Sequence, residues 1–200
     1  MKKLSYLVLF FLLAIPVSAQ NQFKLSSIPF LLSWHNTSKS FQMTDINKRI
    51  STIPHNLIIH NRPVDYEIEK DRISITAAGK TNLFNSPSGK SKVANAPLIL
   101  FEPEADFTMS ARVTGKLKSI YDVAALVIYQ DDDVWAKFCY ENSVHLQPTI
   151  VSVVTRTFSD DCNSMPAGDY AYMAVVKRGS EYSFFYSCLL YTSPSPRDRG

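Results

Sequence analysis

The sequence predicts an all-β fold, and two observations carry that prediction. From Ala96 to Asn163, apolar runs rich in β-branched and aromatic residues alternate with polar turn clusters such as Glu102–Glu104 and Gln130–Asp133. None of these runs keeps the apolar period of a helix beyond one turn. We therefore expect strands joined by short turns, in a single domain that spans Gln20–Ser187.

The two central runs differ in how their apolar residues are arranged. Tyr121–Tyr129 is apolar on both alternating sets, so we expect it to be covered on both faces. The next run alternates between an apolar set and a semi-polar set, which are Ala136, Phe138, Tyr140 and Trp135, Lys137, Cys139, Glu141 respectively. The apolar set is predicted to face the core, and the semi-polar set is predicted to be accessible.

The flanking segments complete the predicted strand content. Strands are expected at Leu57–His60, on both sides of a turn within Tyr66–Thr76 with Ile73 and Ile75 inward, and in a hairpin of Tyr170–Lys177 and Tyr182–Tyr186. Ile28–Trp34 has the composition of an edge strand. Gly79–Val93, rich in Gly, Asn, Ser, Pro and Lys, predicts a surface loop. Thr44 is placed to cap one short helical turn.

A family resemblance rests on the order and spacing of several segments. These are ITAAGKTNLFNSPSG, NAPLILFEPEADFTMSARV, DVAALVIYQDDDVWAKFCYEN and SVVTRTFSDDCNS, which together span about Ile73–Ser187. They resemble a domain-of-unknown-function family of the concanavalin A-like lectin and glucanase superfamily, sometimes labelled "regulation of enolase protein". The resemblance implies a jelly-roll sandwich of two antiparallel sheets, one concave, and no established activity. Members often carry Thr-Asp where this chain has Thr81-Asn82.

The N-terminus has the features of a secretory signal peptide at residues 1–19. Lys2 and Lys3 precede an apolar run from Leu4 to Ile15, and Val17-Ser18-Ala19 fits a cleavage site. The alternative is an N-terminal membrane anchor, but the run is short for a bilayer span. We expect a secreted or periplasmic protein that has no membrane contact after cleavage.

The C-terminal segment Cys188–Gly200 is predicted not to belong to the domain. One choice of codons for Cys188–Asp198 reproduces a transposase-adapter sequence used in DNA library preparation. On this hypothesis the segment is sequencing read-through, and the sandwich is incomplete at its C-terminus. The alternative is a natural, disordered tail rich in Ser and Pro.

Charge and cysteine content limit the classes of partner. The formal charge of +3 comes from the two terminal segments, because Lys2 and Lys3 contribute two charges and Arg197 and Arg199 less Asp198 contribute one. The remaining chain is neutral, which argues against nucleic acid as a partner. Cys139 and Cys162 are compatible with a disulfide or with two buried free thiols. We expect no metal and no cofactor.

The best candidate binding residues are Trp135, Lys137 and Glu141. A Trp ring can stack on a sugar, and Lys and Glu can hydrogen-bond vicinal hydroxyls. The alternative is a Lys–Glu pair beside a Trp that only covers the sheet. Arg156 on the next strand is a further candidate if its register allows. Asp131–Asp133 suits a polar turn better than a calcium site.

These observations predict a non-catalytic binding domain with a poly- or oligosaccharide ligand on its concave sheet. The ligand class rests on superfamily analogy. No catalytic residue is assigned. The alternatives are a glycoside hydrolase, which needs a second carboxylate beside Glu141, and a structural or protein-interaction module.

Overall fold

The computed structural model describes residues 6–12, 21–26, 44–46, 50–53, 55–103 and 106–187, and within these ranges the regular structure is β-strand throughout. The strands are β1 (Tyr6–Leu12), β2 (Asn21–Ser26), β3 (Thr44–Ile46), β4 (Leu57–His60), β5 (Asp65–Ile68), β6 (Arg72–Thr76), β7 (Leu83–Asn85), β8 (Lys92–Ala94), β9 (Leu98–Phe101), β10 (Phe107–Val113), β11 (Val123–Asp131), β12 (Val134–Asn142), β13 (Pro148–Arg156), β14 (Phe158–Pro166), β15 (Ala171–Arg178) and β16 (Glu181–Ser187). The all-β prediction is confirmed. No helix long and apolar enough to cross a membrane occurs in this part of the chain.

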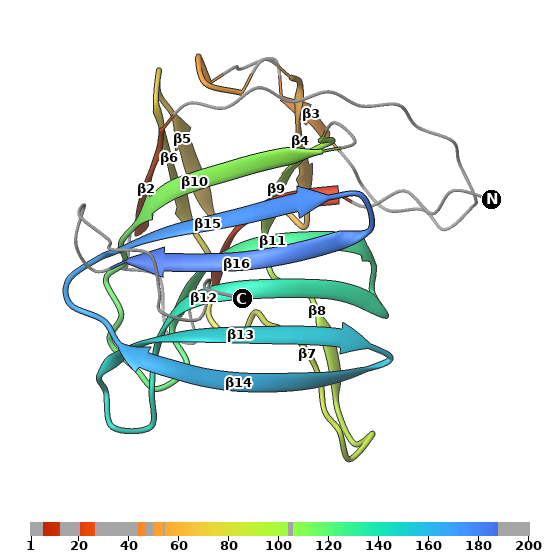
Figure 1. Cartoon of the computed structure of the whole chain (residues 1–200). Helices are drawn as coiled ribbons and strands as arrows, with labels where there is room; N and C mark the ends of the chain where they lie inside the picture. The colour runs from red at the N-terminus through yellow and green to blue at the C-terminus, as the bar shows by residue number, and fades with distance from the viewer. Residues whose placement is uncertain are drawn as a thin grey trace, which may run out of the picture.

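The strands form two large sheets and one small one (Figure 1). The larger sheet has the order β14-β13-β12-β11-β1-β9-β4-β3, and the second has the order β16-β15-β10-β2-β6-β5. A separate hairpin consists of β7 and β8. All strand pairs are antiparallel. Neighbours such as β1 and β11 come from distant parts of the chain, so the order of strands in each sheet is set by long-range pairing.

One apolar core joins the two large sheets. Phe138 and Tyr140 of β12 belong to it together with Ile73 of β6 and Met173 of β15. The ring of Phe138 stacks on that of Phe184, with centroids 4.8 Å apart and planes 7° from parallel. These contacts confirm that the apolar set of β12 faces the core, and that Ile73 faces inward.

A second apolar cluster covers part of the opposite face of the eight-stranded sheet. It contains Val123 and Val127 of β11, Trp135 and Cys139 of β12, and other buried residues that include Leu83 of β7. The strand β11 is therefore buried on both faces from Val123 to Tyr129, whereas Tyr121, which the prediction included, lies before the strand and is exposed. Burial on two faces explains why both alternating sets of that strand are apolar.

Two local predictions are wrong. Gly79–Val93, predicted as a loop, contains β7 and most of β8, because Leu83 inserts into the second cluster and gives this short hairpin a buried anchor. Thr44 begins the strand β3 and pairs with Ile59 instead of capping a helical turn. In both cases contact with a distant strand decides the local structure.

Two predicted segments lie wholly outside the described residues. These are the edge strand at Ile28–Trp34 and the segment Cys188–Gly200. Within the predicted signal peptide, Tyr6–Leu12 forms β1, which pairs with β9 on one side and β11 on the other.

Candidate functional site

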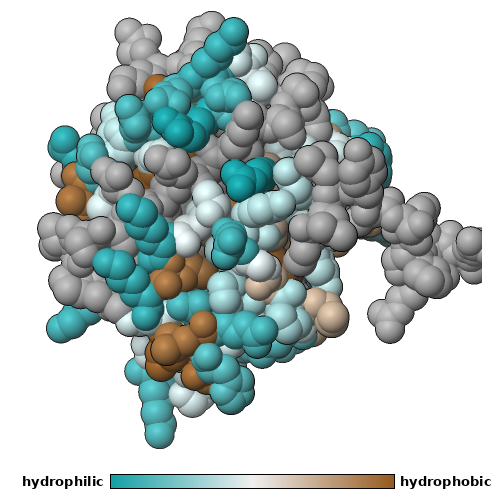
Figure 2. Space-filling model, turned by 90° about the vertical axis from the view of Figure 1, so that its left-hand side faces the viewer, coloured by the Kyte–Doolittle hydropathy of each residue, from teal (hydrophilic) through white to brown (hydrophobic). Residues whose placement is uncertain are grey.

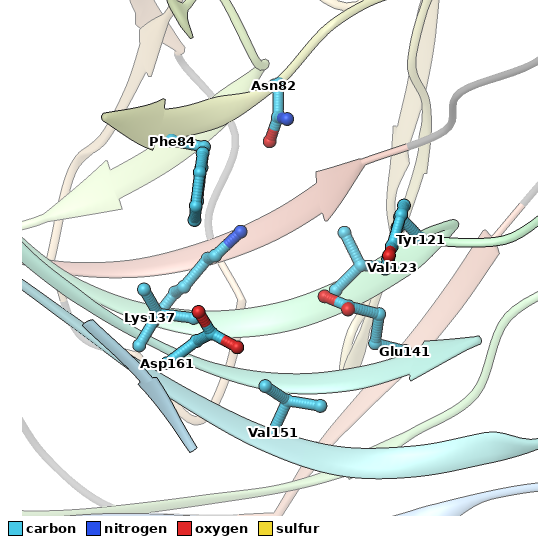
Figure 3. A pocket seen from close by; sticks show the side chains of 9 residues that line it. Asn82, Phe84, Tyr121, Val123, Lys137, Glu141, Val151 and Asp161 are labelled. Carbon is cyan, nitrogen blue, oxygen red and sulfur yellow. The ribbon is translucent and has the colours of Figure 1, made fainter. Parts of the chain in front are cut away.

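A pocket of about 390 Å³ opens on the face of the eight-stranded sheet that carries the second cluster. Its base is formed by strands β11 to β14, and the β7 segment contributes its opposite wall (Figure 3). The lining residues are Asn82, Phe84, Tyr121, Val123, Lys137, Glu141, Val151, Val153 and Asp161. Five separate stretches of sequence therefore meet at this site.

Strand register explains why the charged residues of the pocket share one face. Lys137 pairs with Val153, and Val153 pairs with Asp161, so these three residues form one row across β12, β13 and β14. Residues directly opposite each other in an antiparallel pair project to the same side. Glu141 lies four residues beyond Lys137 on β12 and so projects to that side as well.

Lys137 is the most unusual residue of the pocket. Its side chain is only 4% exposed, and its ammonium group points into the pocket (Figure 3). The Nζ atom lies 5.9 Å from the ring centroids of both Phe84 and Trp135. Among the described residues this ammonium forms no hydrogen bond and no ion pair. The stem of Lys137 is buried, but its Nζ atom does not belong to the enclosed polar atoms that lack a partner, because it is accessible in the pocket. A ligand with acceptor oxygens could therefore reach this ammonium and accept its hydrogen bonds.

Glu141 is held close to neutrality. Burial raises the pKa of its carboxyl group from 4.5 to about 7, with a further rise from the nearby Asp161 carboxylate and an opposing effect of Lys137. At neutral pH this carboxyl group therefore exists in both protonation states. It can donate a hydrogen bond when protonated and accept one when ionised.

The β7–β8 hairpin is fixed to the sheet by a buried polar network. The Asn85 side-chain amide donates hydrogen bonds to the backbone oxygens of Asp132 and Thr157, at 3.0 and 3.1 Å. Its backbone N–H donates to Ser159 Oγ at 2.9 Å. These bonds join the hairpin to two adjacent turns at one end of the sheet, between β11 and β12 and between β13 and β14, and so they hold the neighbouring Phe84 beside Lys137.

The four predicted binding residues separate into two pairs. Lys137 and Glu141 line the pocket. Trp135 is 3% exposed and belongs to the second cluster, because the hairpin covers this end of the face, and it does not line the pocket. Arg156 pairs with Val134 and Phe158, which places it on the opposite face of the sheet, where it is exposed. The prediction of an accessible Trp135 face therefore holds only for the part near Glu141.

Cys139 and Cys162 are both free, the first buried and the second exposed. Cys139 pairs with Val151, whereas Cys162 pairs with Ser152, so the two thiols lie on opposite faces of the sheet. Burial raises the pKa of the Cys139 thiol, and this keeps it protonated. The structure therefore has two free thiols, but it differs from the predicted buried pair because Cys162 is exposed.

Sequence reasoning did not assign Asn82, Phe84, Tyr121 and Asp161 to the site. The sequence did contain a signal for Asn82, because this is the position at which the chain departs from the Thr-Asp pair of the family it resembles.

The Asp131–Asp133 cluster is a turn, in which Asp131 Oδ1 accepts the backbone N–H groups of Asp133 and Val134 at 2.9 and 2.8 Å.

Comparison with known proteins gives one match. A family model described as "Protein of unknown function (DUF1349)" matches residues 59–189, which is more than half of the chain and includes every residue that lines the pocket. No curated protein and no solved structure matches. The chain therefore belongs to the DUF1349 family of proteins of unknown function.

Proposed function

We propose that this protein binds carbohydrate without catalysing a reaction, and that the ligand occupies the pocket around Lys137. The observation that carries the proposal is Lys137, whose stem is buried and whose ammonium points into an open pocket, accessible and without a hydrogen-bond partner among the described residues. Ligand hydroxyl oxygens would accept its hydrogen bonds, and charge assistance strengthens such bonds.

The other lining groups suit a neutral polyhydroxy ligand. The Asp161 carboxylate can accept hydrogen bonds, and the Asn82 side chain and the half-protonated Glu141 can donate or accept. Phe84 and Tyr121 offer aromatic surfaces to the apolar C–H faces of a sugar ring. The charges of Lys137 and Asp161 balance, so the site favours no strongly charged ligand.

We also propose that the fold is a concanavalin A-like jelly-roll sandwich and that the protein is exported. Two large antiparallel sheets that share one core support the first statement. The basic and then apolar sequence of residues 1–19 supports the second.

A second candidate function is glycoside hydrolysis, and one observation favours it. Glu141, with its pKa raised to about 7, and Asp161 line the same pocket. Hydrolysis of this kind uses one protonated and one ionised carboxyl group. Release of reducing sugar from a bound glycan, abolished by Glu141→Gln, would identify an enzyme.

A glycan array followed by titration of the best ligand tests the proposal. Lys137→Met keeps the apolar stem and removes the ammonium, so the affinity should fall roughly tenfold or more. The melting temperature should change little, because Met keeps the packing of the buried stem and the ammonium that is removed faces an open pocket. Lys90→Met, at an exposed position in the hairpin loop, is the control and should bind normally. Absence of any glycan ligand, or full affinity of Lys137→Met, would overturn the proposal.

A further inference from the structure

We propose that the pocket is one subsite of a longer site, and that the ligand is a chain of several sugar units that continues over an apolar ridge at the pocket mouth. This inference rests on the carbohydrate-binding function proposed above. The ridge consists of Ile120 and Tyr121 in the loop before β11 and Val144 and Leu146 in the loop before β13, which are 45, 55, 57 and 57% exposed.

The two loops of the ridge form one connected surface. The Tyr121 backbone N–H donates to Asn142 O at 2.8 Å, and the Asn142 side-chain amide donates to Ser119 O at 3.1 Å. The second loop is closed by a bond from Leu146 N–H to Ser143 O at 3.0 Å. Figure 2 shows the end of the molecule to which these loops belong, with brown apolar patches set low in a largely polar face.

Backbone conformation supplies a second, independent observation. Tyr121 and Leu146 have φ angles of 62° and 56°, in the left-handed region that disfavours large side chains. A glycine at either position would be relaxed, yet each position presents a large apolar side chain to solvent. Asn61, Lys80 and Thr157 share the left-handed conformation, so what distinguishes the ridge is that its two strained residues carry large, exposed apolar side chains.

The surroundings of Tyr121 are built to hold it. The adjacent Asp122 is fully buried, and its Oδ2 atom accepts the backbone N–H groups of Lys118 and Ser119 at 2.8 and 2.9 Å. The loop is thereby closed around the aspartate and leaves the Tyr121 ring exposed. Because hydrogen bonds fix the backbone on both sides of Tyr121, a ligand that stacks on its exposed ring need order little of the loop.

Continuity with the pocket identifies the occupant. Tyr121 belongs both to the pocket lining and to the ridge, so a ligand that fills the pocket and extends beyond it meets the ridge at Tyr121. Sugar rings present apolar C–H faces, and successive rings of an oligosaccharide would lie first on Tyr121 and then on the aliphatic side chains. The ridge therefore suits a neutral oligosaccharide better than a single sugar.

The experiment compares the full-length chain with its variants on an oligosaccharide series of one to six units, taken from the glycan that binds best. Affinity should rise at least tenfold between one and four units. Tyr121→Gly and Leu146→Gly should each remove most of this gain and yet raise the melting temperature by a few degrees, because the left-handed strain is relieved. Tyr121→Phe should keep the gain. Phe185→Ser, at an exposed apolar position of β16, is the control and should bind as the unmodified chain does.

The outcomes distinguish this inference from the function on which it rests. A single sugar that binds through Lys137, with no gain from added units, overturns the ridge and leaves the pocket proposal intact. Absence of any glycan binding overturns both. A ridge whose glycine variants lose self-association or vesicle binding, while the length dependence is unchanged, belongs to a protein or lipid partner and also overturns the inference.

Discussion

At the scale of single residues, the pocket combines groups that a sequence can indicate with groups that it cannot. Lys137 and Glu141 are two positions of one alternating strand, so their shared face follows from local spacing. Asp161 reaches the same face only through the register of β12, β13 and β14. Trp135 projects to the same side of β12 as Lys137, but the β7–β8 hairpin, some fifty residues earlier in the chain, covers it. Alternation predicts which side a residue faces, and long-range packing decides whether that side is open.

Glu141 should make the stability of the protein dependent on pH. Its pKa is about 7 in the folded chain and 4.5 as the reference for the unfolded chain, so the folded state retains a proton that the unfolded state has lost. The stability contributed by this group is complete below pH 4.5 and is lost as the pH rises through 7. Glu141→Gln should therefore match the parent chain at pH 4 and exceed it by about 2 to 3 kcal/mol at pH 8.

Denaturant unfolding at pH 4, 6 and 8 measures this difference. Glu67→Gln, at an exposed position of β5, is the matched control and should give the same pH profile as the parent chain. If the free energies of unfolding of the parent chain and of Glu141→Gln change with pH in the same way, the raised pKa of Glu141 is contradicted.

At the scale of elements, strands with a clear apolar pattern, including the four-residue β4, could be predicted from the sequence, whereas the hairpin of β7 and β8 could not. The runs at β11 and β12 are nine residues long, and their composition and alternation are unambiguous. The strands β7 and β8 have three residues each and lie in a segment rich in Gly, Ser, Asn and Pro. Nothing local distinguishes them from a loop, because their stability comes from Leu83 in the second cluster and from the Asn85 hydrogen bonds.

Asn85→Ala should detach the β7–β8 hairpin from the sheet. Two backbone oxygens, of Asp132 and Thr157, would lose the amide that donates to them, at a cost of about 2 to 3 kcal/mol. Hydrogen exchange should accelerate at the amides of β7 and β8, and glycan affinity should fall because Phe84 is no longer held beside Lys137. Ser88→Ala, at an exposed position of the same hairpin, should change neither quantity. An unchanged exchange rate at Leu83 in Asn85→Ala would contradict this account.

At the scale of the whole molecule, the all-β class and the family could be predicted from the sequence, whereas the arrangement of the sheets could not. The position of β1 is the clearest example. Its sequence has the features of a cleavable signal peptide, yet in the structure it pairs with Leu98–Phe101 of β9 and with Val123–Tyr129 of β11. Both neighbours consist entirely of buried residues in these ranges. The side chains of a strand do not specify which distant strand will be its neighbour.

Removal of residues 1–19 should leave β9 and β11 each without one hydrogen-bonded partner. The shortened chain should melt at a lower temperature and expose two new strand edges. A synthetic peptide with the sequence of Tyr6–Leu12 should restore the melting temperature by filling the gap, whereas a scrambled peptide should not. Equal melting temperatures for the full and shortened chains would mean that another part of the protein pairs with β9 and β11.

The position of β1 also bears on the order in which export and folding take place. If residues 1–19 direct export, the secretion machinery has to recognise a segment that the folded protein encloses between two strands. Recognition must then come before folding, because a chain that folds first has enclosed its export signal in the sheet. The relative rates of recognition by the secretion machinery and of folding would then determine how much protein is exported. The exported fraction in pulse-labelled cells should therefore increase when folding is slowed.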